Sequence, residues 1–269
     1  MSYASREASV DDASPVEFYE LRRGSGVWRY TSAFEDLTYN GFPFSAVPLV
    51  RSRIEQTQEA GRAALRITLP RDTEVVQDFV ATPPSEVTLL TVYRQHRADG
   101  ETAVVWMGRV LNAEWRGAEV ELNCEPVSTS LQRTGLRRLY QRHCPHVLYG
   151  GSCRASPITH RVQGTVSGTS GTTVTVPAAA GVAAGHFSGG YATWSAGGIT
   201  EKRMIVSHAG ESLTLASAPP GLAIGATVML YPGCDHTLAT CEAKFANSAN
   251  FGGFPFIPTK NPFGGSPIY

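Results

Sequence analysis

The residues of this sequence with the clearest capacity for chemistry are its five cysteines, four of which form two pairs. Eight residues separate Cys144 from Cys153. Six separate Cys234 from Cys241, and 80 residues lie between the two pairs. Proline and glycine stand beside the paired cysteines, where they let the backbone turn tightly and aim amide groups at sulfur. Four thiolates held in this way could bind zinc or an iron–sulfur cluster.

Three kinds of site compete for these four cysteines. Disulfides are disfavoured, because the N-terminal sequence is acidic and polar where a signal peptide needs a basic segment and an apolar run, so we expect folding in the reducing cytoplasm. Structural zinc usually has about two to four residues between paired ligands, fewer than these pairs have. The spacings do not match the common ferredoxin patterns either, so the residues alone leave iron and zinc open.

The remaining cysteine and the nearby histidines are assigned no role at a metal site. Cys124 alternates with polar residues in the segment AEVELNC, so we expect it on the buried face of a strand as a small apolar side chain. Four sulfurs already complete a tetrahedral or cubane site, so we do not predict the neighbouring histidines as ligands: His143, His146, His160 and His236.

No feature of the sequence supports catalysis. A cysteine hydrolase would need Cys144 or Cys153 as a nucleophile, with a histidine and an asparagine or aspartate brought alongside. The sequence has no G-x-S-x-G nucleophile elbow and no phosphate-binding loop, and we predict no catalytic residues. Trp106, Trp115 and Trp194 lie in β-like segments, where core packing is expected before a sugar-binding surface.

Charge and hydrophobicity exclude two classes of partner. Lysine and arginine together number 23, as do aspartate and glutamate, so the net charge is zero. The broad attraction to phosphate that non-specific nucleic-acid binding needs is missing, and we predict no direct nucleic-acid binding. No segment approaches the roughly 18 apolar residues needed to cross a bilayer, so we predict no membrane span.

The elements that position the cysteines are mainly β. Polar and apolar residues alternate in several short runs of the N-terminal half, which predicts a meander of antiparallel strands. Hairpin turns are expected near Gly100 and Gly117, and a short helix within residues 72–80. The predicted strands cover residues 17–23, 27–34, 64–70, 86–96, 102–117 and 118–126.

Composition predicts four parts along the chain. Residues 1–130 form an N-terminal β domain, and residues 131–157 form a basic connecting helix and the first cysteine loop. Residues 158–232, rich in threonine, valine, glycine and alanine, form a second small β domain. Residues 233–269 form the second cysteine loop and an aromatic C-terminal arm, which we expect to dock on a neighbour or on the protein itself.

Three motifs around the cysteines are specific. They are C-P-x-x-L-Y-G-x-x-C over residues 144–153, G-C-D-x-x-x-x-x-C over 233–241, and F-x-N-x-x-N-F-G-G-F-P-F-I-P over 245–258. With these motifs, residues 130–262 resemble the C-terminal part of the hub proteins of long, non-contractile phage tails. That family includes minor tail protein L of phage lambda and the hub proteins of gene transfer agents. The N-terminal half matches only in being β-rich and of suitable length.

The resemblance implies a structural, non-enzymatic protein of the virion tail tip. Such a baseplate hub would be assembled in the host cytoplasm as a homo-trimer, between the distal tail protein and the central fibre or receptor-binding protein. The N-terminal domain would be of the tail-tube type, and the second β domain a small β-barrel followed by an iron–sulfur-binding region. The rival functions are a tail module that binds host-surface glycans and a cysteine-dependent cell-wall hydrolase.

The resemblance also implies the ligand set. It places a structural [4Fe–4S] cluster on the four paired cysteines, with zinc as the alternative metal. Because the two pairs lie on either side of an 80-residue segment, bonds from both pairs to one cluster would close that segment as a staple does. The predicted ligands are Cys144, Cys153, Cys234 and Cys241.

Overall fold

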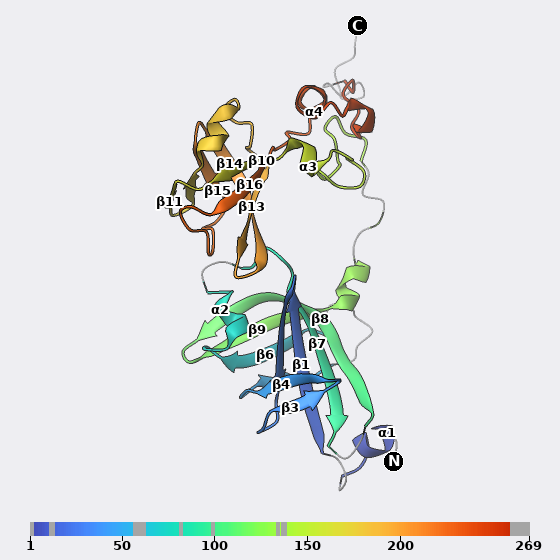
Figure 1. Ribbon diagram of the computed structural model, residues 1–269. Coiled ribbons are helices and arrows are strands. Elements are labelled where there is room, and N and C mark those ends of the chain that lie inside the picture. Colours follow the sequence, from blue (N-terminus) through green and yellow to red (C-terminus); the bar gives the residue numbers. More distant parts are fainter. Residues whose placement is uncertain are drawn as a thin grey trace. The chain divides into compact units, whose positions relative to one another are not determined.

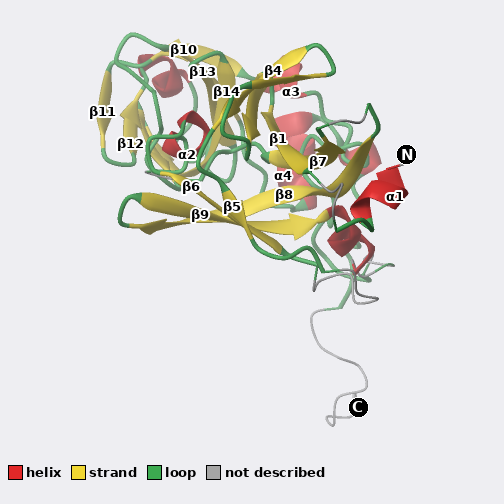
Figure 2. Ribbon diagram, turned by 90° about the horizontal axis from the view of Figure 1, so that it is seen from below, coloured by secondary structure: helices red, strands yellow, loops and turns green. Residues whose placement is uncertain are grey.

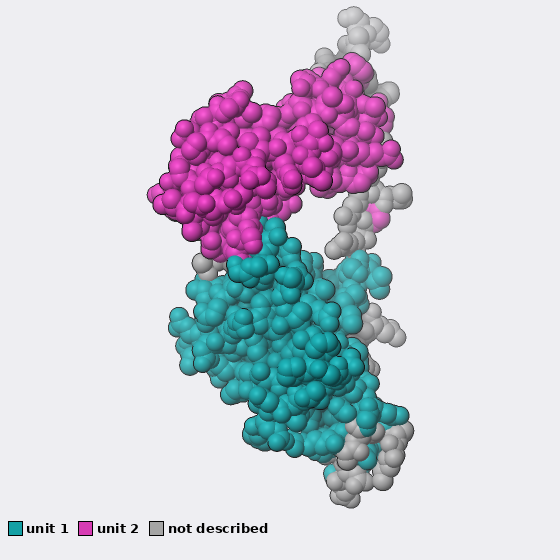
Figure 3. All heavy atoms as spheres, in the orientation of Figure 1, with its two compact units in different colours: residues 1–133, 197–201 teal, residues 134–196, 202–269 magenta. Residues whose placement is uncertain are grey.

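The computed structural model describes most of the chain, namely residues 3–10, 14–55, 63–80, 83–97, 100–132, 135 and 139–258. The chain divides into two compact units, which Figure 3 colours separately. The first unit is Met1–Arg133 with Gly197–Glu201, and the second is Thr134–Ala196 with Lys202–Tyr269. Strands, yellow in Figure 2, make up most of the regular structure of both units. The mainly β fold class predicted from the sequence is therefore confirmed.

The first unit is built on one nine-stranded sheet. Its strands are β1 (Pro15–Arg23), β2 (Gly26–Thr31), β3 (Leu37–Tyr39), β4 (Phe42–Ala46), β5 (Val50–Arg51), β6 (Leu65–Pro70), β7 (Leu89–His96), β8 (Thr102–Arg116) and β9 (Glu119–Pro126). Across the sheet they follow the order β3, β4, β2, β1, β7, β8, β9, β6, β5, and Figure 1 labels all of them except β2 and β5. Neighbours are antiparallel except β2 and β4, which are parallel, so the sheet is mixed.

Alternation of apolar and polar residues explains the strands that the sequence predicted. In β9, Val120, Leu122 and Cys124 are at most 2% exposed, whereas the residues between them reach solvent. Strands β7, β8 and β9 form the predicted meander, and Gly117, with a φ of 64°, makes the turn between the last two. The short strands β3, β4 and β5 were not predicted.

The helices of the first unit are short. They are α1 (Tyr3–Glu7), α2 (Glu74–Gln77) and the 3-10 helix η1 (Val127–Gln132). Helix α2 confirms the helix expected within residues 72–80, although it covers only part of that range, and it buries Val75 and Val76 in the core of the unit. Of the predicted connecting helix, Leu131 and Gln132 end the 3-10 helix η1, residues 133, 134 and 136–138 lie outside the described residues, and residues 139–145 are not helical.

The second unit contains a seven-stranded antiparallel sheet. Its strands are β10 (Val162–Thr165), β11 (Gly168–Ser170), β12 (Thr173–Thr175), β13 (Tyr191–Ala196), β14 (Ile199–Ala209), β15 (Ser212–Leu215) and β16 (Thr227–Tyr231), in the order β10, β16, β13, β14, β15, β12, β11. Strands β10 and β11 lie at opposite edges, yet only Val166 and Ser167 separate them along the chain. The sheet therefore curls into a half-barrel, a coarser form of the predicted small barrel.

Short helices complete the second unit. They are α3 (Pro157–His160), the 3-10 helices η2 (Pro177–Gly181) and η3 (Ser248–Asn250), and α4 (Leu238–Phe245). The half-barrel has its own core, which includes the fully buried side chains of Phe187, Ile205 and Leu230. Trp194 is 3% exposed in this core and Trp106 is 6% exposed in that of the first unit, as expected for packing residues. None of the helices in the described ranges is both long and apolar enough to cross a membrane.

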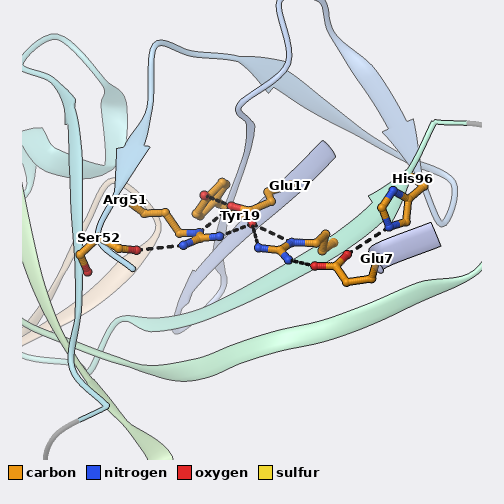
Figure 4. A network of polar contacts seen from close by, with 7 residues as sticks. Glu7, Glu17, Tyr19, Arg51, Ser52 and His96 are labelled. Carbon is orange, nitrogen blue, oxygen red and sulfur yellow. Dashed lines mark hydrogen bonds and ion pairs between the residues drawn. The ribbon is translucent and has the colours of Figure 1, made fainter. Parts of the chain in front are cut away.

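A polar network centred on Glu17 of β1 ties distant segments of the first unit together (Figure 4). The Glu17 carboxylate, 12% exposed, accepts hydrogen bonds from Arg51 at 2.5 and 2.7 Å, from Arg94 at 2.8 Å and from the Tyr19 hydroxyl at 2.6 Å. Arg94 also pairs with Glu7 of α1. Burial raises the pKa of Glu17, but the hydrogen bonds from Arg51, Tyr19 and Arg94 outweigh it and lower that pKa to about 2.

We expect Glu17→Gln to lower the free energy of unfolding at pH 7 by up to about 3 kcal/mol. The pKa of Glu17 is lower in the folded than in the unfolded chain, so its stabilisation is complete above about pH 5 and is lost as the pH falls toward 2. Urea unfolding at pH 7, 5 and 3 measures this, and the variant should lose less stability than the wild type on acidification. Glu114→Gln, at an exposed ion pair, is the control. Equal pH dependence in Glu17→Gln and the wild type would contradict the assignment.

Candidate metal centre

The half-barrel brings the two cysteine loops together. The antiparallel pairing of β10 with β16 places Val162 opposite Leu230, so the chain enters and leaves the half-barrel at one point. Two hydrogen bonds then join the loops directly. The Cys144 N–H donates to the carbonyl oxygen of His236 at 2.9 Å, and the Tyr149 hydroxyl donates to that of Pro232 at 2.9 Å.

The four paired cysteines line one pocket of the second unit. The empty space among its side chains, open solvent at the mouth included, is about 350 Å³. Cys124 is absent from it, since it lies in the core of the first unit, where burial raises its pKa to about 12. The other lining residues are His146, Leu148, His236, Thr237, Phe245, Asn247 and Asn250.

The cysteines surround this pocket as free thiols. All five cysteines of the chain lie in its described part, and none forms a disulfide. Among the described residues, no three histidine, cysteine, aspartate or glutamate side chains are grouped so that they could hold a metal ion. The four cysteines that the sequence predicted as ligands are thus collected at one place, and whether they bind a metal stays a prediction.

Hydrogen-bond donors point at the sulfur atoms. The backbone N–H of His236 donates to Cys234 Sγ at 3.3 Å, and that of Gly252 donates to Cys144 Sγ at 3.4 Å. Such bonds favour the negative thiolate over the neutral thiol. Cys241 differs, because its Sγ donates to the carbonyl oxygen of Asn247 at 3.3 Å, a contact that only a protonated thiol makes.

The electrostatics of the pocket oppose ionisation without a cation. Burial raises the pKa of Cys234, which the His236 N–H partly offsets, and negative charge on Cys153 and Cys144 would raise it further. Burial and the other three paired cysteines likewise raise the pKa of Cys241. Without a cation beside them, the thiols of Cys234 and Cys241 therefore favour the neutral form.

Local hydrogen bonds fix the helix that carries Cys241. The Thr237 side chain caps α4 by accepting from the Thr240 N–H at 3.2 Å, and the Asp235 carboxylate accepts from both threonine hydroxyls at 2.8 Å. Near the other end of α4, Lys244 Nζ donates to the carbonyl oxygens of His186 and Gly233 at 2.6 and 2.8 Å. The second cysteine loop is thereby held against the turn that precedes β13.

The histidines near the cysteines have different surroundings. His146 and His236 line the pocket, whereas the ring of His160 packs on Phe245 with centroids 5.2 Å apart. His143 is not among the lining residues. Sequence reasoning gave no role to Asn247 or Thr237, although Asn247 stands in a motif that it singled out, because their contacts come from segments far away in the chain or from a cap.

At the start of the second cysteine loop, the backbone of Gly233 lies close to that of Ser188. A Cβ atom on Gly233 would overlap the carbonyl oxygen of Ser188, so only glycine fits there. We expect Gly233→Ala to lower the free energy of unfolding of the second unit by about 1–3 kcal/mol. Urea unfolding checks this, with Gly181→Ala as the control, because a Cβ on Gly181 meets no atom within 4 Å. Equal stability of the two variants would contradict the close passage.

Comparison with known proteins identifies two family models. Residues 12–156, more than half of the chain, match a model described as "Baseplate hub protein, N-terminal attachment domain". Residues 185–261, which include the second cysteine pair, match a model described as "Phage conserved hypothetical protein BR0599".

This chain is also similar to part of a longer protein and to a chain of a solved structure. A protein of Xylella fastidiosa (strain 9a5c), described as uncharacterized, is 26% identical over an alignment of 182 residues that covers 62% of this chain and 38% of that protein. A chain in the solved structure "Virion of native gene transfer agent (GTA) particle" superposes with a TM-score of 0.81 at 18% identity, over 99% of this chain and 96% of that one. At that identity the likeness shows a shared fold.

Proposed function

The chain belongs to the baseplate hub family, and we propose that it joins the distal tail tube to the central fibre of a virion. The N-terminal attachment domain of that family matches residues 12–156. A baseplate hub is part of a virion tail, which confirms the family and the location predicted from the sequence. The observation that carries the proposal is this match, which spans most of the first unit.

The role is structural, and its partners are other proteins of the tail. The matched model is described as an attachment domain. This description supports assigning the contact with the distal tail protein to the first unit, which we propose to be a domain of the tail-tube type. The second unit then contacts the central fibre or receptor-binding protein. A homo-trimeric ring is proposed on the resemblance of the cysteine motifs alone.

An iron–sulfur cluster takes four cysteine thiolates, and the four paired cysteines supply donors of that type and number. Four thiols line one pocket, and backbone amides donate hydrogen bonds to the sulfurs of Cys144 and Cys234. A bound [4Fe–4S] cluster would supply bonds that cross-link the two loops and so fix the entrance of the half-barrel. Zinc remains the alternative metal, and the motifs around the cysteines favour iron.

The rival functions gain no support from the residues that would carry them. Of the candidates for a sugar-binding surface, Trp106 and Trp194 are buried in the two cores, and the partly exposed Trp115 packs against the core of the first unit. A cysteine hydrolase needs a histidine beside its nucleophile, whereas the Cys144 sulfur accepts from the Gly252 N–H and the Cys153 sulfur lies 3.8 Å from the Asn247 amide; in the described part of the chain neither bonds to a histidine. We therefore propose neither glycan binding nor hydrolysis for this chain.

Anaerobically purified full-length protein should be brown, with broad absorbance near roughly 400 nm and about four irons per chain. Cys153→Ala and Cys241→Ala should each lose most of this absorbance, because a cluster ligand is removed. Cys124→Ala, in the core of the first unit, should keep it and is the control. Iron-free protein loaded with zinc would refute the cluster and leave the hub role standing.

In the particle that carries this chain, Cys234→Ala should yield few functional tails, so the infectious or gene-transfer titre should fall at least about tenfold. Negative-stain imaging of purified particles would show incomplete tail tips, and Cys124→Ala particles should look normal. Images of the wild-type tail tip would also show whether the proposed ring has three-fold symmetry. Complete, active tails from particles that lack the chain would refute the hub assignment.

A further inference from the structure

The motif over residues 245–258 contains two asparagines and a glycine pair, and the binding of a cluster by four cysteines does not explain why they are there. This segment follows α4 and begins the C-terminal arm. Ala246 adopts the left-handed conformation, with a φ of 47°, and turns the chain back toward the pocket. The residues that follow contact three of the four paired cysteines.

Asn247 contacts a cysteine of each loop. Its side-chain Nδ2 donates to the carbonyl oxygen of Cys153 at 2.5 Å and lies 3.8 Å from the Sγ of the same residue. Its backbone N–H donates to the carbonyl oxygen of Cys241 at 3.1 Å, and its own carbonyl oxygen accepts from Cys241 Sγ at 3.3 Å. One residue therefore bridges the two loops through both its main chain and its side chain.

The orientation of the Asn247 amide is set by a second asparagine. Asn250 Nδ2 donates to Asn247 Oδ1 at 2.7 Å, so the oxygen faces Asn250 and the NH₂ group faces Cys153. An aspartate at position 247 would place an oxygen against the Cys153 carbonyl oxygen and a negative charge beside the thiolates. The site therefore requires an amide, and a carboxylate of the same shape cannot replace it.

The glycine pair lets the arm lie against the first loop. Gly252 donates its N–H to Cys144 Sγ, and a Cβ on Gly252 would overlap the imidazole of His146. A Cβ on Gly253 would lie 2.6 Å from the carbonyl oxygen of Arg142. The next residue, Phe254, donates its N–H to the carbonyl oxygen of Gln141 at 2.9 Å.

We propose that Asn247 and Gly252 are positioning residues of the metal centre, which hold Cys153, Cys241 and Cys144 in place for the cluster. The inference rests on the proposed function in one respect, the presence of the cluster. It adds that the arm controls how tightly the cluster is retained. The amide of Asn247 and the N–H of Gly252 hydrogen-bond to the ligand residues and do not bind the metal themselves. Loss of one such hydrogen-bond partner typically weakens metal binding by about 10- to 100-fold.

The test compares Asn247→Asp with Asn40→Asp, a control at an exposed turn of the first unit whose left-handed backbone suits aspartate. The full chain is loaded with iron and sulfide, and loss of absorbance near roughly 400 nm is followed in excess chelator. Asn247→Asp should lose its cluster at least about tenfold faster than the wild type. The visible circular dichroism of the remaining cluster should also change, which a loss of overall stability alone would not cause.

Gly252→Ala is the second variant, and Gly151→Ala is its control, because a Cβ on Gly151 meets no atom within 4 Å. Gly252→Ala should lose the cluster faster, and Gly151→Ala should match the wild type. In metal-free protein, a thiol reagent should label the pocket cysteines of Asn247→Asp and Gly252→Ala several-fold faster than those of the controls.

The outcomes separate this inference from the proposed function. If the wild type takes up no iron, the proposed cluster is wrong, and the thiol labelling decides the role of the arm: faster labelling supports it, and equal labelling overturns it. If the wild type holds iron, and both variants lose iron and react with the reagent at wild-type rates, the positioning role is wrong and the cluster stands.

Discussion

The pairing of β10 with β16 is the constraint on which the second unit depends. It brings together the two ends of residues 162–231, so the entropy of closing that segment is offset by the sheet and its buried core. The Cys144–His236 and Tyr149–Pro232 hydrogen bonds extend this closure to the cysteine loops. The thiols are therefore gathered by the protein fold itself, and a bound metal would reinforce an arrangement that the strands already set.

Much of the fold could be predicted because the strands are long enough to show their period. Strands β7, β8 and β9 alternate apolar and polar residues over eight or more positions and pair with their neighbours in the chain. Strands β3 and β5 have three and two residues, too few to show any period. The parallel pairing of β2 with β4 and the meeting of Glu17 with Arg94 depend on contacts between distant segments, which local patterns do not encode.

The cysteines of the candidate site could be predicted from the sequence, whereas the residues that hold them in place could not. The grouping of cysteines into two pairs and the burial of Cys124 follow from sequence spacing and alternation. That both pairs line one pocket was expected only from the resemblance of the surrounding motifs. The role of Asn247 could not be predicted, because its contact with Cys153 joins residues 94 positions apart and depends on the turn at Ala246.

The pairing of the first and last strands of the half-barrel, β10 and β16, affects how such proteins can evolve. Because β10 and β16 begin and end the segment side by side, strands or loops inside it can be lengthened, shortened or exchanged while its two ends stay where they are. Inside the segment, the turn before β13 is in contact with the second cysteine loop, through His186 and Ser188. A hub of this design can therefore diversify the rest of its half-barrel surface while that turn and the cysteine loops evolve under separate constraints.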